Sequence, residues 1–321
     1  GLDPIFYPDA AMAFIQKTGI EGHAYNTMNF SGALIYNWYP EKKVFQGSFY
    51  SEKEIHRREG MTFTGVIEKY SITHAILETP LKYLSTGLFP PQDWALVYWD
   101  DTALVMARRT PKNTRIIKDH DFRLIDPESL LVQIEGESIP LGALAELERE
   151  TREAPQCSLG HLALAALYRT MKRYREAEAE YLRVLELPPH WSFVGDYLSK
   201  NPYHILALNH LGVMYSQQGR LREAEDFFLR AIRNGPLYQE AYYNLGILYT
   251  GEGKLEKAEK ALKKALKIEP NHSWAWNNLG VVLMRQGNIH EAREAFLRAI
   301  VADHYNIEAR TNLEKISSES Y

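Results

Sequence analysis

The stretch NHLGVMYSQQGRLREAEDFFLRAIRNGP, residues 209–236, decides the fold because its pattern returns along the chain. Residues 243–270, YNLGILYTGEGKLEKAEKALKKALKIEP, repeat its Leu-Gly pair, an aromatic residue, a second Gly, an Ala within a charged run and a closing Pro. The Ala recurs at a constant interval, at Ala224, Ala258 and Ala292. Small residues that recur as strictly as large ones indicate points where two backbones lie close together.

Each 34-residue unit predicts a pair of antiparallel helices, because apolar residues recur at helical spacing in both of its halves. The first Gly of a unit allows a close crossing of the two helices, and a large side chain fills the space around it. The second Gly stands where the first helix ends and the chain turns, and the Pro ends the second helix. The first glycines are Gly212, Gly246 and Gly280, the second are Gly219, Gly253 and Gly287, and the large residues are Phe228, Leu262 and Phe296.

This 34-residue pattern of Leu-Gly-x2-Tyr, Ala-x3-Phe and Pro resembles the tetratricopeptide repeat (TPR), and Trp276 supplies the Trp that opens the motif. Residues 161–189, HLALAALYRTMKRYREAEAEYLRVLELPP, carry the same pattern further upstream. We therefore predict four TPR units, at residues 158–191, 205–238, 239–272 and 273–306, and a capping helix at residues 306–316.

An insertion separates the first predicted unit from the second. The interval from Ala177 to Ala224 is longer than one period, and the excess falls at residues 190–204. The aromatic residues of this segment fit two alternatives, a helix extension that packs on the array or a binding loop. They are Trp191, Phe193 and Tyr197.

Residues 1–137 alternate strand-like and helix-like runs, which indicates an α/β domain. The strand-like runs lie at residues 23–28, 43–49 and 73–79, and the helix-like runs at 9–19, 52–60, 63–71 and 80–87. Residues 94–108 read as a hairpin around Asp100 and Asp101, so the predicted sheet is mixed. The predicted fold is an α/β domain at residues 1–137, a helical linker at 138–157 and an all-α TPR superhelix at 158–316.

Residues 6–109 also resemble the soluble segment that follows the membrane-spanning part of bacterial GT-C-type glycosyltransferases. The match runs through SGALIY (31–36), YPE (39–41), VF (44–45) and the closing hairpin. It fails at residues 46–48, where the chain has Gln-Gly-Ser and the family has Asp-Gly-Arg. The resemblance implies the extracytoplasmic, non-catalytic C-terminal region of a membrane-anchored protein, with the membrane anchor upstream; a cytoplasmic location is the alternative.

The composition argues against several function classes. A net charge of -4 gives no electrostatic reason to bind nucleic acid or an anionic membrane surface. Cys157 is the only cysteine, so we expect it to be buried filler and not part of a disulfide or a cysteine-rich zinc site. The chain has no glycine-rich phosphate loop, HExxH motif or GxSxG elbow. We therefore expect no catalytic residue, metal or cofactor, and no membrane contact by this chain itself.

The first helices of stacked TPR pairs line a concave groove, which in this family commonly holds a peptide or a partner helix. Asn side chains there can hold a peptide backbone, while Tyr, Trp and Met offer apolar contact. The Asn residues before Leu-Gly have a second interpretation, since in TPRs they often stabilise the array itself. The predicted groove residues are Asn209, Val213, Tyr243, Asn244, Ile247, Trp274, Asn277, Asn278, Val281, Met284 and Arg285.

The predicted partner is a protein or a peptide, and the charges at the predicted groove indicate which kind of peptide is expected. TPRs that capture a C-terminal carboxylate carry Lys and Arg at defined groove positions, where this chain has Asn209, His210 and Tyr243. An acidic tail is therefore not the expected ligand. The basic run at residues 254–267 fits either a solvated outer surface or an anion site. The predicted function is a protein-interaction scaffold, and the alternative is the non-catalytic extracytoplasmic region described above.

Overall fold

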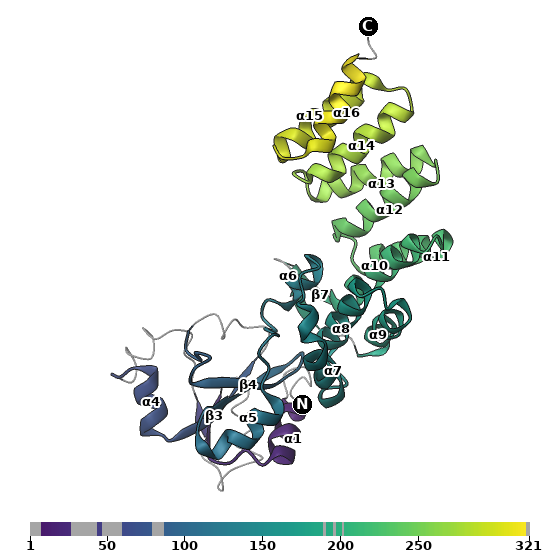
Figure 1. Cartoon of the computed structure of the whole chain (residues 1–321). Helices are drawn as coiled ribbons and strands as arrows, with labels where there is room; N and C mark the ends of the chain where they lie inside the picture. The colour runs from purple at the N-terminus through teal and green to yellow at the C-terminus, as the bar shows by residue number, and fades with distance from the viewer. Residues whose placement is uncertain are drawn as a thin grey trace. The chain divides into compact units, whose positions relative to one another are not determined.

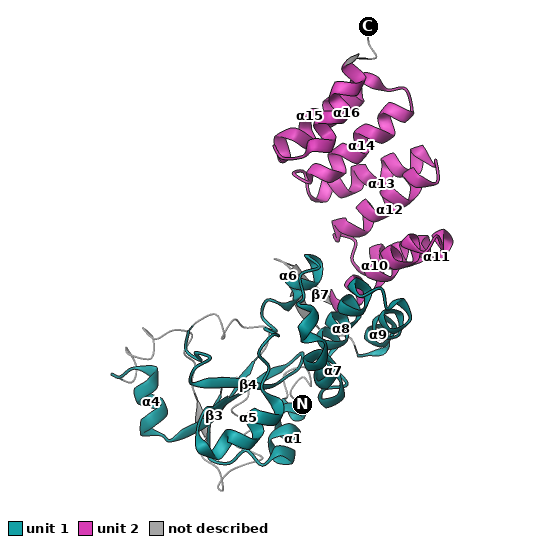
Figure 2. Cartoon of the chain, viewed as in Figure 1, with its two compact units in different colours: residues 1–192 teal, residues 193–321 magenta. Residues whose placement is uncertain are grey.

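The computed structural model describes residues 8–26, 44–46, 60–78, 87–188, 191–194, 197–200 and 202–318. By its internal contacts the chain divides into two compact units, Gly1–Ser192 and Phe193–Tyr321 (Figure 2). Unit 1 contains a sheet and the first pair of repeat helices, and unit 2 contains the later repeats (Figure 1). The division falls inside the predicted insertion because the first helical pair packs with the elements that precede it.

Unit 1 is built on a five-stranded mixed sheet with the strand order β2-β1-β3-β5-β4. The strands β1, β2 and β3 are parallel, whereas β5 is antiparallel to both β3 and β4. The predicted α/β fold with a mixed sheet and a hairpin at its end is therefore confirmed. The strands are β1 (His23–Asn26), β2 (Val44–Gln46), β3 (Ile72–Glu78), β4 (Trp94–Trp99) and β5 (Ala103–Arg108).

The hairpin strands lie in the core of unit 1. All six residues of β4 and five of the six of β5 are buried, so these strands read as continuous apolar runs and not as alternating ones. Phe89 packs between the hairpin and a helix: its ring centroid lies 5.1 Å from that of Trp94 in β4 and 5.2 Å from that of Phe63. Two of the predicted helices cover the sheet, α1 (Asp9–Thr18) and α4 (Phe63–Lys69).

The predicted helices at residues 52–60 and 80–87 lie almost wholly outside the described residues, as does most of the glycosyltransferase-like match at 31–45. The rest of unit 1 is helical. Its elements are η4 (Pro111–Asn113), α5 (Thr114–His120), α6 (Leu130–Glu135), η5 (Leu141–Ala143), α7 (Leu144–Glu153), α8 (Ser158–Thr170) and α9 (Tyr174–Glu186).

Asp101, in the turn between β4 and β5, caps the first repeat helix. Its carboxylate accepts hydrogen bonds from the backbone N–H groups of Ser158 at 2.6 Å and Leu159 at 3.0 Å. These N–H groups have no partner within α8, and the positive end of the helix dipole favours a carboxylate there. The hairpin thereby fixes the position at which the helical array begins.

Cys157 completes this cap from the other side. Its thiol donates to Asp101 Oδ1 at 3.4 Å, and its sulfur accepts from the N–H of Gly160 at 3.3 Å. The prediction that Cys157 is buried is confirmed, but its role as a helix cap was missed. Asp100 holds the turn itself, because it accepts from the Tyr98 hydroxyl at 2.7 Å and from the N–H of Ala103 at 2.8 Å.

Glu150 of α7 points its carboxyl group into this cap region and is only 1 % exposed. A Cβ atom added to Gly160 would lie 1.8 Å from Glu150 Oε2, so the two elements touch closely. Burial raises the pKa of Glu150 well above its ordinary value; a hydrogen bond with the Cys157 thiol opposes this, and the charges of Asp101 and Asp100 raise the pKa further. The carboxyl group therefore holds its proton at a pH where an exposed Glu is ionised.

We expect Glu150→Gln to stabilise the protein increasingly as the pH rises. A raised pKa in the folded state contributes stability below the unfolded-state pKa, and that stability is lost as pH rises towards the folded-state pKa. The neutral amide of the variant has the same shape and does not titrate. Thermal unfolding from about pH 5 to about pH 8 should show a growing advantage for Glu150→Gln, and none for the exposed control Glu186→Gln. An advantage that is constant with pH would contradict this assignment.

Unit 2 consists of helix pairs followed by a final helix, as predicted for a TPR superhelix (Figure 1). Before them, β6 (Trp191–Val194) and β7 (Tyr197–Lys200) form a two-stranded sheet, so the helix-extension interpretation of these residues is wrong. The helices are α10 (Pro202–Gln217), α11 (Leu221–Asn234), α12 (Gln239–Gly251), α13 (Leu255–Ile268), α14 (Ser273–Arg285), α15 (Ile289–Ala302) and α16 (Ile307–Ser318).

The first Gly of each pair in unit 2 faces the large side chain of its second helix. A Cβ atom added to Gly246 would lie 2.7 Å from Cγ of Leu262. The same addition at Gly212 and Gly280 would place it 2.6 Å and 2.5 Å from the opposite Phe rings. No real Cβ atom tolerates such contacts, so the predicted close crossing is confirmed.

Gly246→Ala should therefore destabilise unit 2 by about 1–3 kcal/mol, the usual cost of overpacking. Gly251 is the matched control, since a Cβ atom added there meets nothing within 4 Å. Chemical denaturation of the two variants would measure the difference. Equal midpoints for Gly246→Ala and Gly251→Ala would show that the crossing is looser than described.

The second Gly of each pair ends the first helix in the left-handed conformation, with φ of 74° at Gly219, 72° at Gly253 and 83° at Gly287. The following N–H bonds back to the helix, as from Lys254 to the Tyr249 carbonyl at 2.9 Å, which is the Schellman pattern. In the first pair, Lys172 occupies this place with φ of 60°.

Lys172→Gly should stabilise the first pair by about 1 kcal/mol, because a residue with a Cβ atom is strained in this conformation. Gly253→Ala should cost a similar amount of about 1 kcal/mol, and its Cβ atom would touch nothing within 4 Å. Unfolding free energies from urea titration test both changes. Shifts of the same sign would argue against backbone strain as the cause.

Candidate functional site

The first helices of unit 2 lie next to one another, since α10 contacts α12, α12 contacts α14 and α14 contacts α16. We call the surface formed by the predicted groove residues on these first helices the first-helix row. Residues one repeat apart take equivalent places on successive helices, so the row is a set of aligned positions.

Exposure differs sharply among the predicted groove residues. Ile247 and Trp274 are 42 % and 44 % exposed, high values for large apolar side chains. Arg285 is also exposed, whereas Asn209 and Asn277 are buried. The remaining members are half-buried; they are Val213, Tyr243, Asn244, Asn278, Val281 and Met284.

Amide side chains connect successive first helices through a ladder of hydrogen bonds. Nδ2 of Asn244 donates to Oδ1 of Asn209 at 3.0 Å, and Nδ2 of Asn278 donates to the Tyr243 hydroxyl at 3.2 Å. In both contacts the partners belong to neighbouring repeats, so each rung links one unit to the next. This geometry supports the interpretation that the Asn residues before Leu-Gly stabilise the array.

A third rung, from Nδ2 of Asn312 to Oδ1 of Asn277 at 3.0 Å, extends the ladder into α16. Sequence reasoning missed Asn312, although the Asn-Leu pair at residues 312–313 repeats the two earlier ones. Arg285 adds a rung of a different kind, because its guanidinium donates to the Thr250 carbonyl at 3.2 Å.

The Oδ1 atoms of Asn244 and Asn278 accept no hydrogen bond from the described residues. Each of these amides also has a second N–H beyond the one used in its rung. A ligand backbone that lay along the row could therefore both donate to and accept from these side chains while the ladder stays intact.

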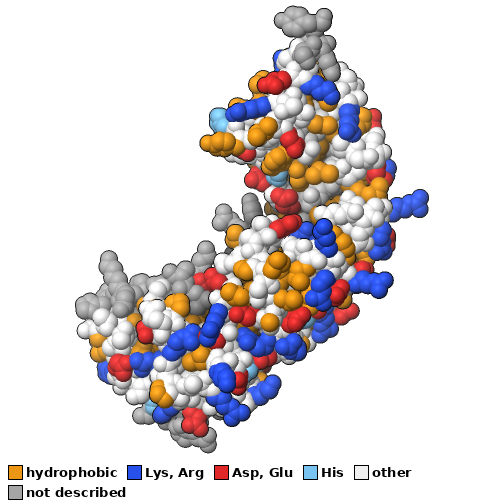
Figure 3. Space-filling view, viewed as in Figure 1, with side chains coloured by type: hydrophobic (Ala, Val, Ile, Leu, Met, Phe, Trp, Pro, Cys, Tyr) orange, Lys and Arg blue, Asp and Glu red, His pale blue; other side chains and the backbone are white. Residues whose placement is uncertain are grey.

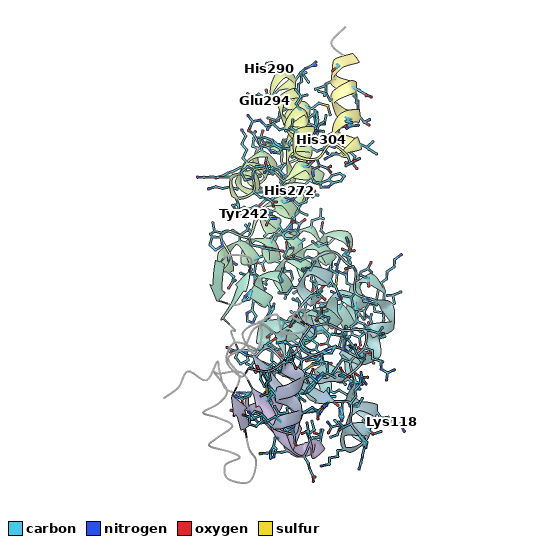
Figure 4. All side chains as sticks on the ribbon, turned by 90° about the vertical axis from the view of Figure 1, so that its left-hand side faces the viewer. Lys118, Tyr242, His272, His290, Glu294 and His304 are labelled. Carbon is cyan, nitrogen blue, oxygen red and sulfur yellow. The ribbon has the colours of Figure 1, made fainter. Side chains whose placement is uncertain are left out.

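His272 forms a corner of the row beside Tyr243, with ring centroids 4.7 Å apart. Its Nδ1 accepts from the N–H of Ala275 at 3.2 Å and so caps α14, while Nε2 lies 3.4 Å from Oε1 of Glu240. The hydrogen bond with Glu240 raises the pKa of His272. In Figure 4, His272 lies between Tyr242 and His304 on one side of unit 2.

Carboxylates gather around this corner. Nε2 of Gln239 donates to Oε1 of Glu240 at 3.1 Å and to Oε2 of Glu269 at 2.9 Å, so both carboxylates meet one amide. Burial raises the pKa of Tyr243 to about 12, with further contributions from the charges of Glu240 and Glu308. Figure 3 shows acidic side chains beside hydrophobic ones over the repeats of unit 2.

The basic run on α13 is different in character. A shallow hollow there has a mixed lining, and Lys263 pairs with Glu259 at 2.6 Å. Positive charge on this face is therefore partly neutralised. The lining residues are Glu256, Glu259, Lys260, Lys263, Lys264 and Lys267.

The described residues form neither a metal-binding cluster nor a helix able to span a membrane. No group of three or more His, Cys, Asp and Glu side chains there is placed to hold a metal ion. No helix in that part of the chain has the length and apolar character needed to cross a membrane.

Comparison with family models identifies the repeats. Models described as tetratricopeptide repeat match residues 160–190, 205–233, 240–272 and 261–294. The chain carries tetratricopeptide repeats. No curated protein matches the chain. Nothing in these comparisons supports the glycosyltransferase-like resemblance or the extracytoplasmic location, which stay predictions.

Solved structures of TPR proteins are similar to parts of the chain. The first TPR of Spaghetti (RPAP3), bound to an HSP90 peptide, is 24 % identical and covers 36 % of this chain and 91 % of its own, with a TM-score of 0.35. MamA is 21 % identical over 57 % of this chain and 97 % of its own, with a TM-score of 0.43. YrrB, a TPR protein with an unusual peptide-binding site, is 18 % identical over 62 % and 95 %, with a TM-score of 0.41.

Proposed function

We propose that this protein is an interaction scaffold whose first-helix row in unit 2 binds a peptide or a segment of a partner protein. The observation that supports it most is the exposure of Trp274 and Ile247 on neighbouring helices, where the Asn residues of the row are packed and hydrogen-bonded. TPR arrays are typical of non-enzymatic binding modules.

The row is suited to binding because it is already ordered. Asn209 and Asn277 are buried and used in rungs of the ladder, so the surface between them does not have to form when a ligand arrives. A preorganised surface loses less conformational entropy on association. Complete burial of a fully exposed Ile side chain contributes roughly 1.5–3 kcal/mol, and Ile247, which is 42 % exposed, would contribute a part of that on binding.

The amides supply the polar half of the interaction. The free Oδ1 and N–H groups of Asn244 and Asn278 can pair with the main chain of an extended ligand, as amide side chains do in general. Apolar contact then gives affinity, and backbone pairing gives orientation.

The test uses a library of random 12-residue peptides displayed on phage and selected on the intact chain. Peptides so selected should bind the double variant Ile247→Ala/Trp274→Ala at least about tenfold more weakly, because exposed aromatic anchors dominate such interfaces. Melting temperature should fall by no more than it does in the control double variant below, whose side chains have similar exposure.

The matched control is Leu229→Ala/Leu297→Ala, which removes side chains of similar exposure from the second helices α11 and α15. It should leave peptide affinity unchanged in calorimetric titration. Equal binding by the wild type and the Ile247→Ala/Trp274→Ala variant would remove the row as the binding surface.

A further inference from the structure

Glu240, Trp274 and Glu308 occupy the same position in three successive repeats. They lie on α12, α14 and α16, which are neighbours in that order. The exposed indole of Trp274 is therefore flanked by a carboxylate on each adjacent first helix. We call these three residues the acid–Trp–acid row.

Three acidic residues of the second helices in unit 2 have basic partners close to them in the sequence. By contrast, Glu240, Glu269 and Glu308 have no Lys or Arg partner within residues 202–318, and only His272 approaches Glu240. The second-helix pairs are Glu223 with Arg220, Glu259 with Lys263 and Glu294 with Arg298.

Aromatic faces show the same contrast. Several other rings of unit 2 are covered by a cation of the chain: Arg220 lies 4.0 Å from the centroid of Tyr215, and Arg298 lies 4.8 Å from that of Trp276. In the described part of the chain no Lys or Arg lies over Trp274. A cation over an indole face is favourable, and nearby carboxylates strengthen the attraction.

A second, apolar row runs parallel to the first. Val213, Ile247 and Val281 again take one position in successive repeats, on successive first helices. Ile247 follows Glu240 by two helical turns, so the two rows share a face and lie about 10 Å apart along the helices. Trp274 and Ile247 lie on neighbouring first helices, whose axes are about 8–10 Å apart, so the two side chains are separated by about 14 Å. An extended peptide spans this distance in about four residues.

From this arrangement we infer that the ligand of the first-helix row is a basic–apolar peptide. A Lys or Arg side chain of the peptide lies over Trp274 between Glu240 and Glu308, and an apolar residue about four positions away lies against Ile247. This inference rests on the proposed function of the row. It describes a ligand opposite in charge to an acidic C-terminal tail.

The experiment uses the phage-displayed peptides selected on the wild-type chain. Their sequences should be enriched in Lys or Arg about four residues from Leu, Ile, Val or Phe. Glu240→Gln/Glu308→Gln should weaken binding of these peptides about tenfold, since it removes both flanking charges without changing shape. The single variant Glu308→Gln tests the same charge effect without touching the contact between Glu240 and His272.

Two controls keep the outcomes separate. Glu256→Gln/Glu291→Gln removes two charges from second helices and should leave affinity unchanged. Replacing the basic residue of a selected peptide by norleucine should weaken its binding to the wild type as much as the Glu240→Gln/Glu308→Gln substitutions do. The same replacement should cause no further loss of affinity for that variant.

The results distinguish this inference from the proposed function. The selected peptides can depend on Ile247 and Trp274 and still carry no basic residue, or bind Glu240→Gln/Glu308→Gln as well as the wild type. Either outcome would overturn the basic–apolar ligand and leave the row as a binding surface. Peptides that bind without depending on Ile247 and Trp274 would overturn both.

Discussion

In each repeat of unit 2 a glycine on the first helix faces a large side chain on the second, and the geometry of that unit depends on this contact. At Gly246 the space for a Cβ atom is already occupied by Leu262, and at Gly280 it is occupied by Phe296. Since the contact recurs once in every repeat, each pair has the same crossing, and equivalent residues of successive first helices line up. The rows of the proposed binding surface follow from that alignment.

The amide ladder takes advantage of this alignment. In each rung the donor is the residue just before a Leu, such as Asn244, and the acceptor lies two residues before the Leu of the preceding unit, such as Asn209. These two positions meet in every repeat only if successive helix pairs stack with the same offset. Asn244 with Asn209 and Asn312 with Asn277 meet at the same distance of 3.0 Å, although they are separated along the array. Hydrogen bonds within the row thus make its surface rigid, while Ile247 and Trp274 are left exposed for contact with another chain.

The sequence was sufficient for features that depend on period and side-chain size. Gly219, Gly253 and Gly287 do end their helices in the left-handed conformation, and the mixed sheet has the predicted hairpin. It was insufficient where contacts join distant segments. Asp101 caps a helix that begins far along the chain at Ser158, and no local pattern marks that pairing. Aromatic residues at 191–197 suit a strand as well as a helix, so periodicity could not decide between them.

The distribution of charge within unit 2 is hard to reconcile with a purely structural role for the first-helix row. Ion pairs on the second helices place Arg220, Lys263 and Arg298 close to their own acids, which partly neutralises those faces. Glu240 and Glu269 instead share one amide donor, an arrangement in which two like charges repel. His272 is the one basic side chain near Glu240 among residues 202–318, and in our proposal a cation of the ligand over the Trp274 indole adds further compensating charge.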